Sequence, residues 1–458
     1  MIDDVLARID RDLPAAVARL CDFIRIPSVS ADPARSSDCV SAAAWLREAL
    51  AEIGFSSRLH ETAGKPIVTA SMPSRGRPRV LFYGHYDVQP ADPANLWCSP
   101  PFEPAIGRNA AGGETIVGRG SADDKGQLLT FVEACRAWRQ AADGLPVDVT
   151  MLFEGEEETG SAHLGKFIED HRAELAADVA LICDTNMWDS ATPALVVALR
   201  GLLQAELMVE AANRDLHSGV YGGGAENPIH VLARIVAAIK DGNNRIALPG
   251  FYEDVRPAPD AVRRQWSRMG LTVEALLGPV GLAQPSGERG RDLVDQVQFR
   301  PTFDINGIVG GYTGEGTKTI IPARAAAKLS FRLVADQDPV KIMRTLESFV
   351  AARVPFDCRF RLDVQDLTPP AEVDAEAPAL AVARAALQDE WGCEPVLVGS
   401  GGSIPVVSLF KRLLGVDTML MGFGLDDDRI HAPDEKYDLA CFRKGTRTWA
   451  RFLGRCAG

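Results

Sequence analysis

Four short apolar runs, separated by stretches of helical periodicity, constrain the fold of this chain more than any other feature. They are rich in β-branched residues, are bounded by polar or glycine-rich turns, and span residues 78–88, 147–154, 178–184 and 417–424. Such runs are typical of strands buried on both faces of a sheet. The helical patterns between them cover residues 37–53, 126–140, 161–176 and 378–391. The alternation predicts an α/β fold with a mostly parallel sheet covered by helices.

The middle of the chain follows a different pattern. A length of 458 residues exceeds what one hydrophobic core usually organises, so two domains are expected. From residue 199 to 368, strand-like alternation, an amphipathic helix, alternation, another helix and alternation follow one another, which is typical of an α+β unit with one open sheet face. We therefore predict one domain from residues 1–198 and 369–458, with residues 199–368 inserted. Residues 254–292 are expected to be an additional helical insertion.

Net charge, the length of apolar runs and cysteine spacing exclude several kinds of partner and location for this protein. The formal net charge of −13 argues against nucleic acid or an anionic membrane as partner. No run of about 18 apolar residues is present, and the N-terminal residues lack the pattern of a signal peptide. The nine cysteines are irregularly spaced, which favours reduced thiols. A cytoplasmic protein is expected.

Histidine and acidic residues follow the predicted strands. Because ligands bind beyond the carboxyl ends of parallel strands, side chains from these segments are expected to converge there. The candidate metal ligands are His85, Asp123, Glu158, Asp184 and His431. Imidazole nitrogen and carboxylate oxygen suit zinc, manganese or cobalt, and this set is sufficient for two ions that share one carboxylate. Glu157 would remain free as a general base, and Asp87 could orient His85.

Several motifs, in a characteristic order, support a family assignment. They include GHYDVQP at 84–90, GRGSADDKGQ at 118–127, EGEEETGS at 154–161, HSG at 217–219, NGIVGGYTGEGTKTIIP at 306–322, GGSIPV at 401–406 and HAPDE at 431–435. With these motifs the chain resembles, over nearly its full length, the zinc metallopeptidases that include carnosinase and cytosolic non-specific dipeptidase. The carnosinase-like branch is the most similar.

The resemblance implies roles for the candidate ligands. Asp123 would bridge two divalent ions, most simply zinc, with manganese or cobalt as alternatives. Glu158 and His431 would complete the site of one ion, and His85 and Asp184 that of the other. Glu157 would take a proton from the bridging water and deliver it to the leaving amine. The peptide bond between Asp123 and Asp124 is expected to be cis.

The resemblance also implies that the inserted domain is a ferredoxin-like lid that forms a homodimer. His217 would then reach the active site of the neighbouring subunit and stabilise the oxyanion. Substrate contacts are expected from Asn306, Thr319, Arg332 and Ser403. Arg332 suits a substrate carboxylate because its planar fork can bind it through two hydrogen bonds.

One departure leaves the substrate open. Relatives in the carnosinase-like branch usually have Arg-Glu before Gly-Gly-Ser, whereas this chain has Gly399-Ser400 before Gly401. Loss of the glutamate removes a counter-charge for a free amine. A dipeptidase is the main hypothesis, and an N-acyl or N-carbamoyl amino acid amidohydrolase with the same site is the alternative. A non-catalytic binding protein is a third hypothesis, which the intact Glu157 and ligand set oppose.

Overall fold

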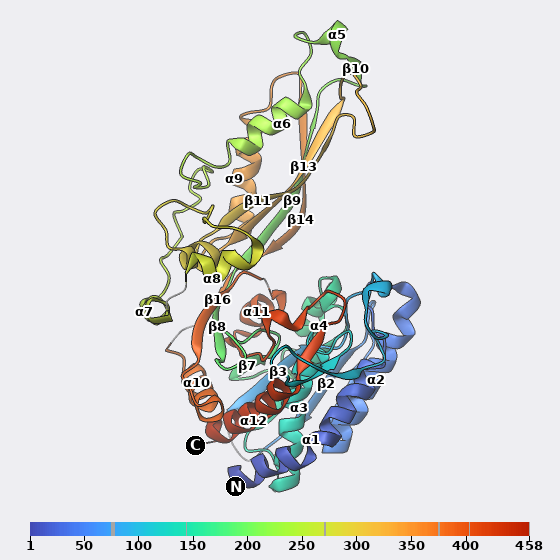
Figure 1. Ribbon diagram of the computed structural model, residues 1–458, viewed down its shortest axis with the longest axis vertical. Coiled ribbons are helices and arrows are strands. Elements are labelled where there is room, and N and C mark those ends of the chain that lie inside the picture. Colours follow the sequence, from blue (N-terminus) through green and yellow to red (C-terminus); the bar gives the residue numbers. More distant parts are fainter. Residues whose placement is uncertain (75–77, 143, 270–271, 374–375, 403, 458) are drawn as a thin grey trace. The chain divides into compact units, whose positions relative to one another are not determined.

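The computed structural model describes all residues except 75–77, 143, 270–271, 374–375, 403 and 458 (Figure 1). The described chain divides into two compact units. The first comprises residues 1–197, 373–398 and 405–458, and the second comprises residues 198–372 and 399–404. The functional roles expected for the two units remain predictions.

The larger sheet has nine strands and carries the four predicted runs at its centre. Its order is β1-β2-β6-β3-β7-β17-β8-β15, with β16 paired to β8. The central strands β6, β3, β7 and β17 are mutually parallel, whereas the pairs toward both edges are antiparallel. The strands are β1 (Ser56–His60), β2 (Ile67–Met72), β3 (Arg79–His85), β6 (Asp148–Glu154), β7 (Val179–Ile182), β8 (Ala194–Leu199), β15 (Ala371–Glu372), β16 (Val396–Ser400) and β17 (Thr418–Leu420).

Helices pack around this sheet and contact one another. α3 packs against α1 and α12, and α12 also packs against α10. Phe82 of β3 stacks on Phe131 of α3 at a ring distance of 4.0 Å, and Trp449 of α12 meets both rings edge-on. The helices are α1 (Ile2–Ile24), α2 (Ser36–Ile53), α3 (Lys125–Ala141), α4 (Leu164–Asp170), α10 (Pro378–Trp391), α11 (Pro405–Leu409) and α12 (Leu439–Cys456). These contacts bury large aromatic side chains between sheet and helices.

A small antiparallel sheet joins distant parts of the first unit. It consists of β4 (Ala105–Arg108), β5 (Glu114–Val117) and β18 (Lys436–Asp438) in the order β18-β5-β4. Tyr437 lies opposite Ile116 in this sheet. The pairing brings the segment after His431 next to the segment before Asp123.

The second unit contains a four-stranded antiparallel sheet with two helices. Its order is β11-β13-β9-β14, which in chain order is the arrangement of a ferredoxin-like β-α-β-β-α-β fold. The elements are β9 (Gly201–Glu210), α6 (Pro228–Ala237), β11 (Thr302–Gly310), β13 (Arg324–Leu333), α9 (Pro339–Ala351) and β14 (Arg359–Thr368). The predicted α/β fold with an inserted α+β domain is confirmed.

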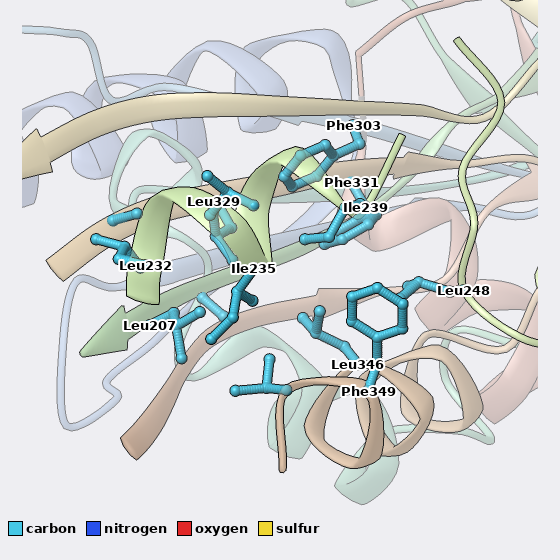
Figure 2. Packing of buried hydrophobic residues seen from close by; sticks show 14 of the residues in the cluster. Leu207, Leu232, Ile235, Ile239, Leu248, Phe303, Leu329, Phe331, Leu346 and Phe349 are labelled. Atoms are coloured by element: carbon cyan, nitrogen blue, oxygen red, sulfur yellow. The ribbon is translucent and has the colours of Figure 1, made fainter. Parts of the chain in front are cut away.

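Alternation along β9 explains how this sheet packs. Leu203, Ala205 and Leu207 are buried, and the residues between them are half-buried. These buried side chains belong to one cluster with residues of α6 and α9, and Figure 2 labels Leu207 together with Ile235 and Leu346. Along β9 the opposite face carries Gln204 and Glu206 as well as Leu202 and Met208. The unit also contains β10 (Leu216–His217), α5 (Ser218–Tyr221) and β12 (Ile320–Ile321).

The predicted helical insertion is only partly helical. It contains α7 (Asp260–Met269), α8 (Val273–Leu277) and a short 3₁₀ turn, Gly278–Val280. The prediction is wrong for residues 254–259 and 281–292, which form turns, bends and irregular backbone. Gly281 and Gly290 have positive φ angles of 75° and 78°, a backbone conformation that ends helices. Helix α4 is also shorter than the predicted 161–176. Among the described residues, no helix combines the length and the hydropathy needed to span a bilayer.

Candidate metal centre

Strand ends bring the predicted ligands of the first unit to one edge of the sheet. His85 is the last residue of β3, Asp184 follows β7, and Glu158 lies in the 3₁₀ turn Glu157–Thr159 after β6. These strands are parallel neighbours, so their carboxyl ends meet. Asp123 directly precedes the cap of α3, and His431 follows the 3₁₀ turn Asp426–Asp428.

The five side chains form two groups that share Asp123. His85, Asp123 and Asp184 make one group, and Asp123, Glu158 and His431 make the other. Within each group the potential ligand atoms all lie within 4.8 Å of one another. The two oxygens of Asp123 face different histidines: Oδ1 is 3.1 Å from His85 Nε2, and Oδ2 is 2.9 Å from His431 Nε2. The carboxylate of Asp123 therefore stands between the two groups.

Asp184 completes the first group and Glu158 completes the second. Asp184 Oδ2 lies 3.8 Å from His85 Nε2, and Glu158 Oε2 lies 3.3 Å from His431 Nε2. The second oxygen of Glu158, Oε1, is buried and accepts no hydrogen bond from the described residues. A buried carboxylate oxygen without a partner is costly unless a cation binds it. The donor set of each group, one imidazole and two carboxylates, fits a divalent ion such as zinc.

Asp87 connects the histidine and the glutamates. This fully buried carboxylate accepts backbone N–H groups from Glu157, at 3.3 Å, and from Glu158, at 3.1 Å. The backbone carbonyl oxygen of Asp87 lies 3.1 Å from His85 Nδ1, and its Oδ1 lies 3.4 Å from the same nitrogen. Asp87 thus orients both the imidazole and the turn that presents Glu157 and Glu158.

The cluster holds more negative charge than its histidines balance. Burial raises the pKa of Asp184 and of Glu157, and neighbouring carboxylates add to both shifts. Burial would also raise the pKa of Asp123, but hydrogen bonds with His431 and His85 bring it well below its usual range. Burial would lower the pKa of His85, but hydrogen bonds with Asp123 and Asp87 raise it. An arrangement of this kind favours bound cations.

The backbone next to Asp123, the ligand that both groups share, has the expected cis peptide bond. The peptide bond between Asp123 and Asp124 is cis, as the resemblance implies. Asp124 Oδ2 accepts the backbone N–H of His85 at 3.1 Å, and the Asp124 side chain is fully buried. Asp124 therefore ties the first turn of α3 to the end of β3.

Sequence reasoning missed three residues that support the centre. Gln89 Nε2 donates to Glu158 Oε2 at 2.6 Å. Arg119 and Glu435 form a buried ion pair of 2.7 Å beneath the segment that ends in Asp123. The signal was present, because Arg119 lies in the GRG motif and Glu435 in HAPDE. Nothing in spacing along the chain could indicate that these two charges meet.

The remaining candidate residues belong to the second unit. His217 is exposed at the end of β10, and its Nδ1 accepts the backbone N–H of Gly219 at 3.0 Å. Asn306 is exposed beside an irregularity in the pairing of β11. Thr319 is exposed before β12, and Arg332 is half-buried on β13. The roles of these four residues remain predictions, and Ser403 lies outside the described residues.

Comparison with known proteins identifies the family. The model of peptidase family M20/M25/M40 matches residues 81–455. The chain belongs to this family. This M20 peptidase is 29% identical to the Cys-Gly metallodipeptidase DUG1 of Candida albicans, over 96% of this chain and 94% of the relative. It is 28% identical to the Beta-Ala-His dipeptidase of Rattus norvegicus, over 85% of this chain and 79% of the relative.

A solved structure agrees with this assignment. The M20 family metallo-carboxypeptidase Sso-CP2 from Sulfolobus solfataricus gives a TM-score of 0.84 at 29% identity, covering 96% of this chain and 99% of that chain. The predicted membership in the carnosinase-like branch is therefore confirmed. The chain is a metal-dependent peptidase, and its candidate metal ligands lie in the two groups that share Asp123.

Proposed function

We propose that this M20 peptidase hydrolyses the amide bond of a small substrate with a free carboxylate, most simply a dipeptide. The observation that carries the proposal is the pair of ligand groups that share Asp123, with Glu157 next to the ligand Glu158 in the chain. The names of the relatives support a dipeptide, because one cleaves Cys-Gly and another Beta-Ala-His. A free carboxylate is also what a carboxypeptidase such as the Sulfolobus relative requires.

Two divalent ions would occupy these groups, most simply zinc, with manganese or cobalt as alternatives. His85 and Asp184 would hold one, Glu158 and His431 the other, and Asp123 both. When bound, such ions polarise a carbonyl and lower the pKa of a water molecule. The chain's own contribution is to hold five ligands in place and to supply the proton acceptor.

Glu157 is the general base of the proposed mechanism. Its backbone N–H is anchored on Asp87, and its side chain adjoins Glu158 without belonging to either ligand group. Its carboxylate would accept a proton from the attacking water and return it to the leaving amine.

His217 would donate a hydrogen bond to the developing oxyanion. Because Nδ1 accepts the N–H of Gly219, the neutral ring carries its proton on Nε2 and presents a donor there. Arg332, Asn306 and Thr319 would bind the substrate carboxylate or carbonyl, with Ser403 as a further contact. In this proposal the protein is a homodimer and His217 acts in trans.

An N-acyl or N-carbamoyl amino acid is the second candidate substrate. A side chain at Gly401 would meet the guanidinium of Arg200, since Arg200 Nη2 lies 2.7 Å from the Cβ position. The segment that begins at Gly399 therefore lies beside a positive charge and lacks a carboxylate. Without a carboxylate in this segment, a substrate ammonium group loses a counter-charge, whereas a neutral acyl group needs none.

A substrate panel separates the two candidates. Zinc-loaded protein is assayed with Cys-Gly, β-Ala-His and other free dipeptides, and in parallel with N-acetyl and N-carbamoyl derivatives of single amino acids. Faster hydrolysis of the free dipeptides supports dipeptidase activity, and the reverse order supports the alternative.

The Glu157→Gln variant tests the mechanism. It should bind metal like the parent and lose at least about 100-fold in kcat, because a positioned general base contributes about 10²–10⁴. Full metal content with parental activity would remove Glu157 from the mechanism.

A cytoplasmic location is also part of this proposal, supported by nine free cysteines and the acidic charge.

A further inference from the structure

Arg119 and Glu435 form a buried ion pair that belongs to neither ligand group. The pair connects chain segments that carry the candidate metal ligands. Arg119 and Glu435 lie 316 positions apart in the sequence, and Arg119 Nη1 donates to Glu435 Oε2 at 2.7 Å. The two side chains are 1% and 0% exposed. A buried ion pair is a weak source of stability, because removing both charges from water offsets most of their attraction. Its contacts with the backbone suggest another role.

Glu435 binds the segment that ends in Asp123. Its Oε2 accepts the N–H of Gly120 at 2.9 Å, and its Oε1 accepts the N–H groups of Ala122, at 2.9 Å, and Asp123, at 3.1 Å. Both oxygens of the carboxylate are therefore occupied by donors. The backbone of Asp123 is held directly by Glu435.

Arg119 forms hydrogen bonds with two further segments of the chain. Its Nη2 donates to the carbonyl oxygens of Pro90, at 3.3 Å, and Ala432, at 3.4 Å. Its guanidinium also lies over the ring of Trp97, 5.3 Å from the centroid. Pro90 follows the strand end that carries His85, and Ala432 is next to His431. Arg119 thus contacts the backbone next to His431 and the segment that follows His85.

We propose that the Arg119–Glu435 pair is a positioning device for both metal groups, which places Asp123 relative to His431 and to the His85 segment. Neither side chain belongs to a ligand group, so the pair acts only through the backbone it holds. Asp123 is common to the two groups, and a shift of its backbone therefore disturbs both ions. The inference rests on the proposed two-metal function.

The Glu435→Gln variant tests the pair with little change of shape. An amide has one acceptor oxygen, so its NH₂ must face either the N–H groups of Ala122 and Asp123 or the donors of Gly120 and Arg119. Either orientation loses acceptors for the segment that ends in Asp123. Loss of an outer partner of a metal ligand typically lowers metal affinity or activity by about 10–100-fold. We expect the zinc dissociation constant of Glu435→Gln to rise by that factor.

A second variant and a matched control separate positioning from general destabilisation. Arg119→Lys keeps the charge but lacks the fork that reaches Glu435, Pro90 and Ala432 together, so a smaller loss of affinity is expected. Glu390 is the control, since it is 5% exposed and pairs with Arg447, at 2.6 Å, and Arg451, at 2.9 Å, in the same unit. Glu390→Gln should lower thermal stability and leave metal affinity unchanged.

Three measurements are made on each full-length protein: zinc affinity by competition titration, the visible spectrum of the cobalt-loaded form, and the thermal midpoint of the metal-free form. Weaker zinc binding and an altered cobalt spectrum in Glu435→Gln and Arg119→Lys, but not in Glu390→Gln, support the proposal. Parental affinity and spectrum in Arg119→Lys or in folded Glu435→Gln overturn it. If the parent itself does not bind two ions, the proposed function fails instead.

Discussion

At the scale of single residues, Asp87 links the turn that carries Glu157 and Glu158 to the histidine ligand His85. One carboxylate accepts the N–H groups of Glu157 and Glu158 and adjoins the imidazole of His85. In Asp87→Asn, one oxygen becomes an NH₂ group, which cannot accept an N–H. We expect kcat to fall by about 10–100-fold while the protein stays folded, as for other partners of metal ligands. Steady-state kinetics and circular dichroism measure both quantities.

Asp148 offers a matched control for this variant. It is the first residue of β6, at the end of the strand opposite to Glu157, and its carboxylate also accepts a backbone N–H, from Ser74 at 2.5 Å. Asp148→Asn should leave kcat at the parental value. An equal loss of kcat in both variants would show that Asp87 acts through stability alone.

The site residues divide into those that sequence alone can indicate and those that it cannot. His85, Glu158 and Asp184 could be expected together because each follows a strand of one parallel sheet. Arg119 and Glu435 could not, because their pairing depends on the register of β18 against β5, between segments more than 300 residues apart. The orientation of Asp123 between two histidines likewise depends on packing. The metal-ligand and catalytic roles remain predictions.

At the scale of elements, Gly126 controls how α3 approaches the segment before Asp123. A Cβ atom at this position would lie 1.9 Å from the backbone oxygen of Ser121 and 2.7 Å from the ring of Tyr437. Backbone cannot move aside as a flexible side chain can, so Gly126→Ala should lower the free energy of unfolding by about 3 kcal/mol, the upper range for overpacking. Urea denaturation measures this change.

Gly165 in α4 provides the contrasting substitution. The nearest atom to its Cβ position is Leu409 Cδ2 at 3.6 Å, an ordinary contact. Gly165→Ala should therefore stabilise the protein by about 0.5–1 kcal/mol, because alanine loses less conformational entropy in a helix. Equal stability of the two variants would contradict the role assigned to Gly126.

Some helices and strands of the structure agree with the sequence patterns, and others do not. Residues 378–391 were predicted as a helix and coincide with α10, which has proline at its first position and Gly392 after its end. The alternation of β9 correctly predicted a sheet with one buried face. Residues 281–292 are not helical although the surrounding pattern predicts a helix, because Pro285 and three glycines disfavour one. The antiparallel outer pairs of the large sheet also had no signal in the sequence, since pairing direction depends on distant partners.

At the scale of the whole molecule, bound metal should stabilise the folded chain. The candidate ligands come from five segments spread between residues 85 and 431, so they meet only when the first unit is folded. An ion that binds only the folded state adds about 2.7 kcal/mol at 100 times its dissociation constant. We expect the thermal midpoint of chelator-treated protein to rise with added zinc.

Asp123→Asn is the control for this titration, because it removes the charge that the two groups share. Its midpoint should respond far less to zinc than that of the parent. A parental midpoint that is independent of zinc would contradict specific binding to the folded state.

Subunit mixing tests whether two chains share one site. If His217 acts in trans, a dimer of one His217→Ala chain and one Glu157→Gln chain has one site with both intact residues and one with neither. Random exchange makes half of the dimers mixed, so activity should recover to about a quarter of the parental value per chain in a two-fold symmetric dimer. The mixture is assayed after exchange, with its mass checked by light scattering. Activity no higher than the sum of the separate variants, in a mixture that has exchanged, would place Glu157 and His217 of each site on the same chain.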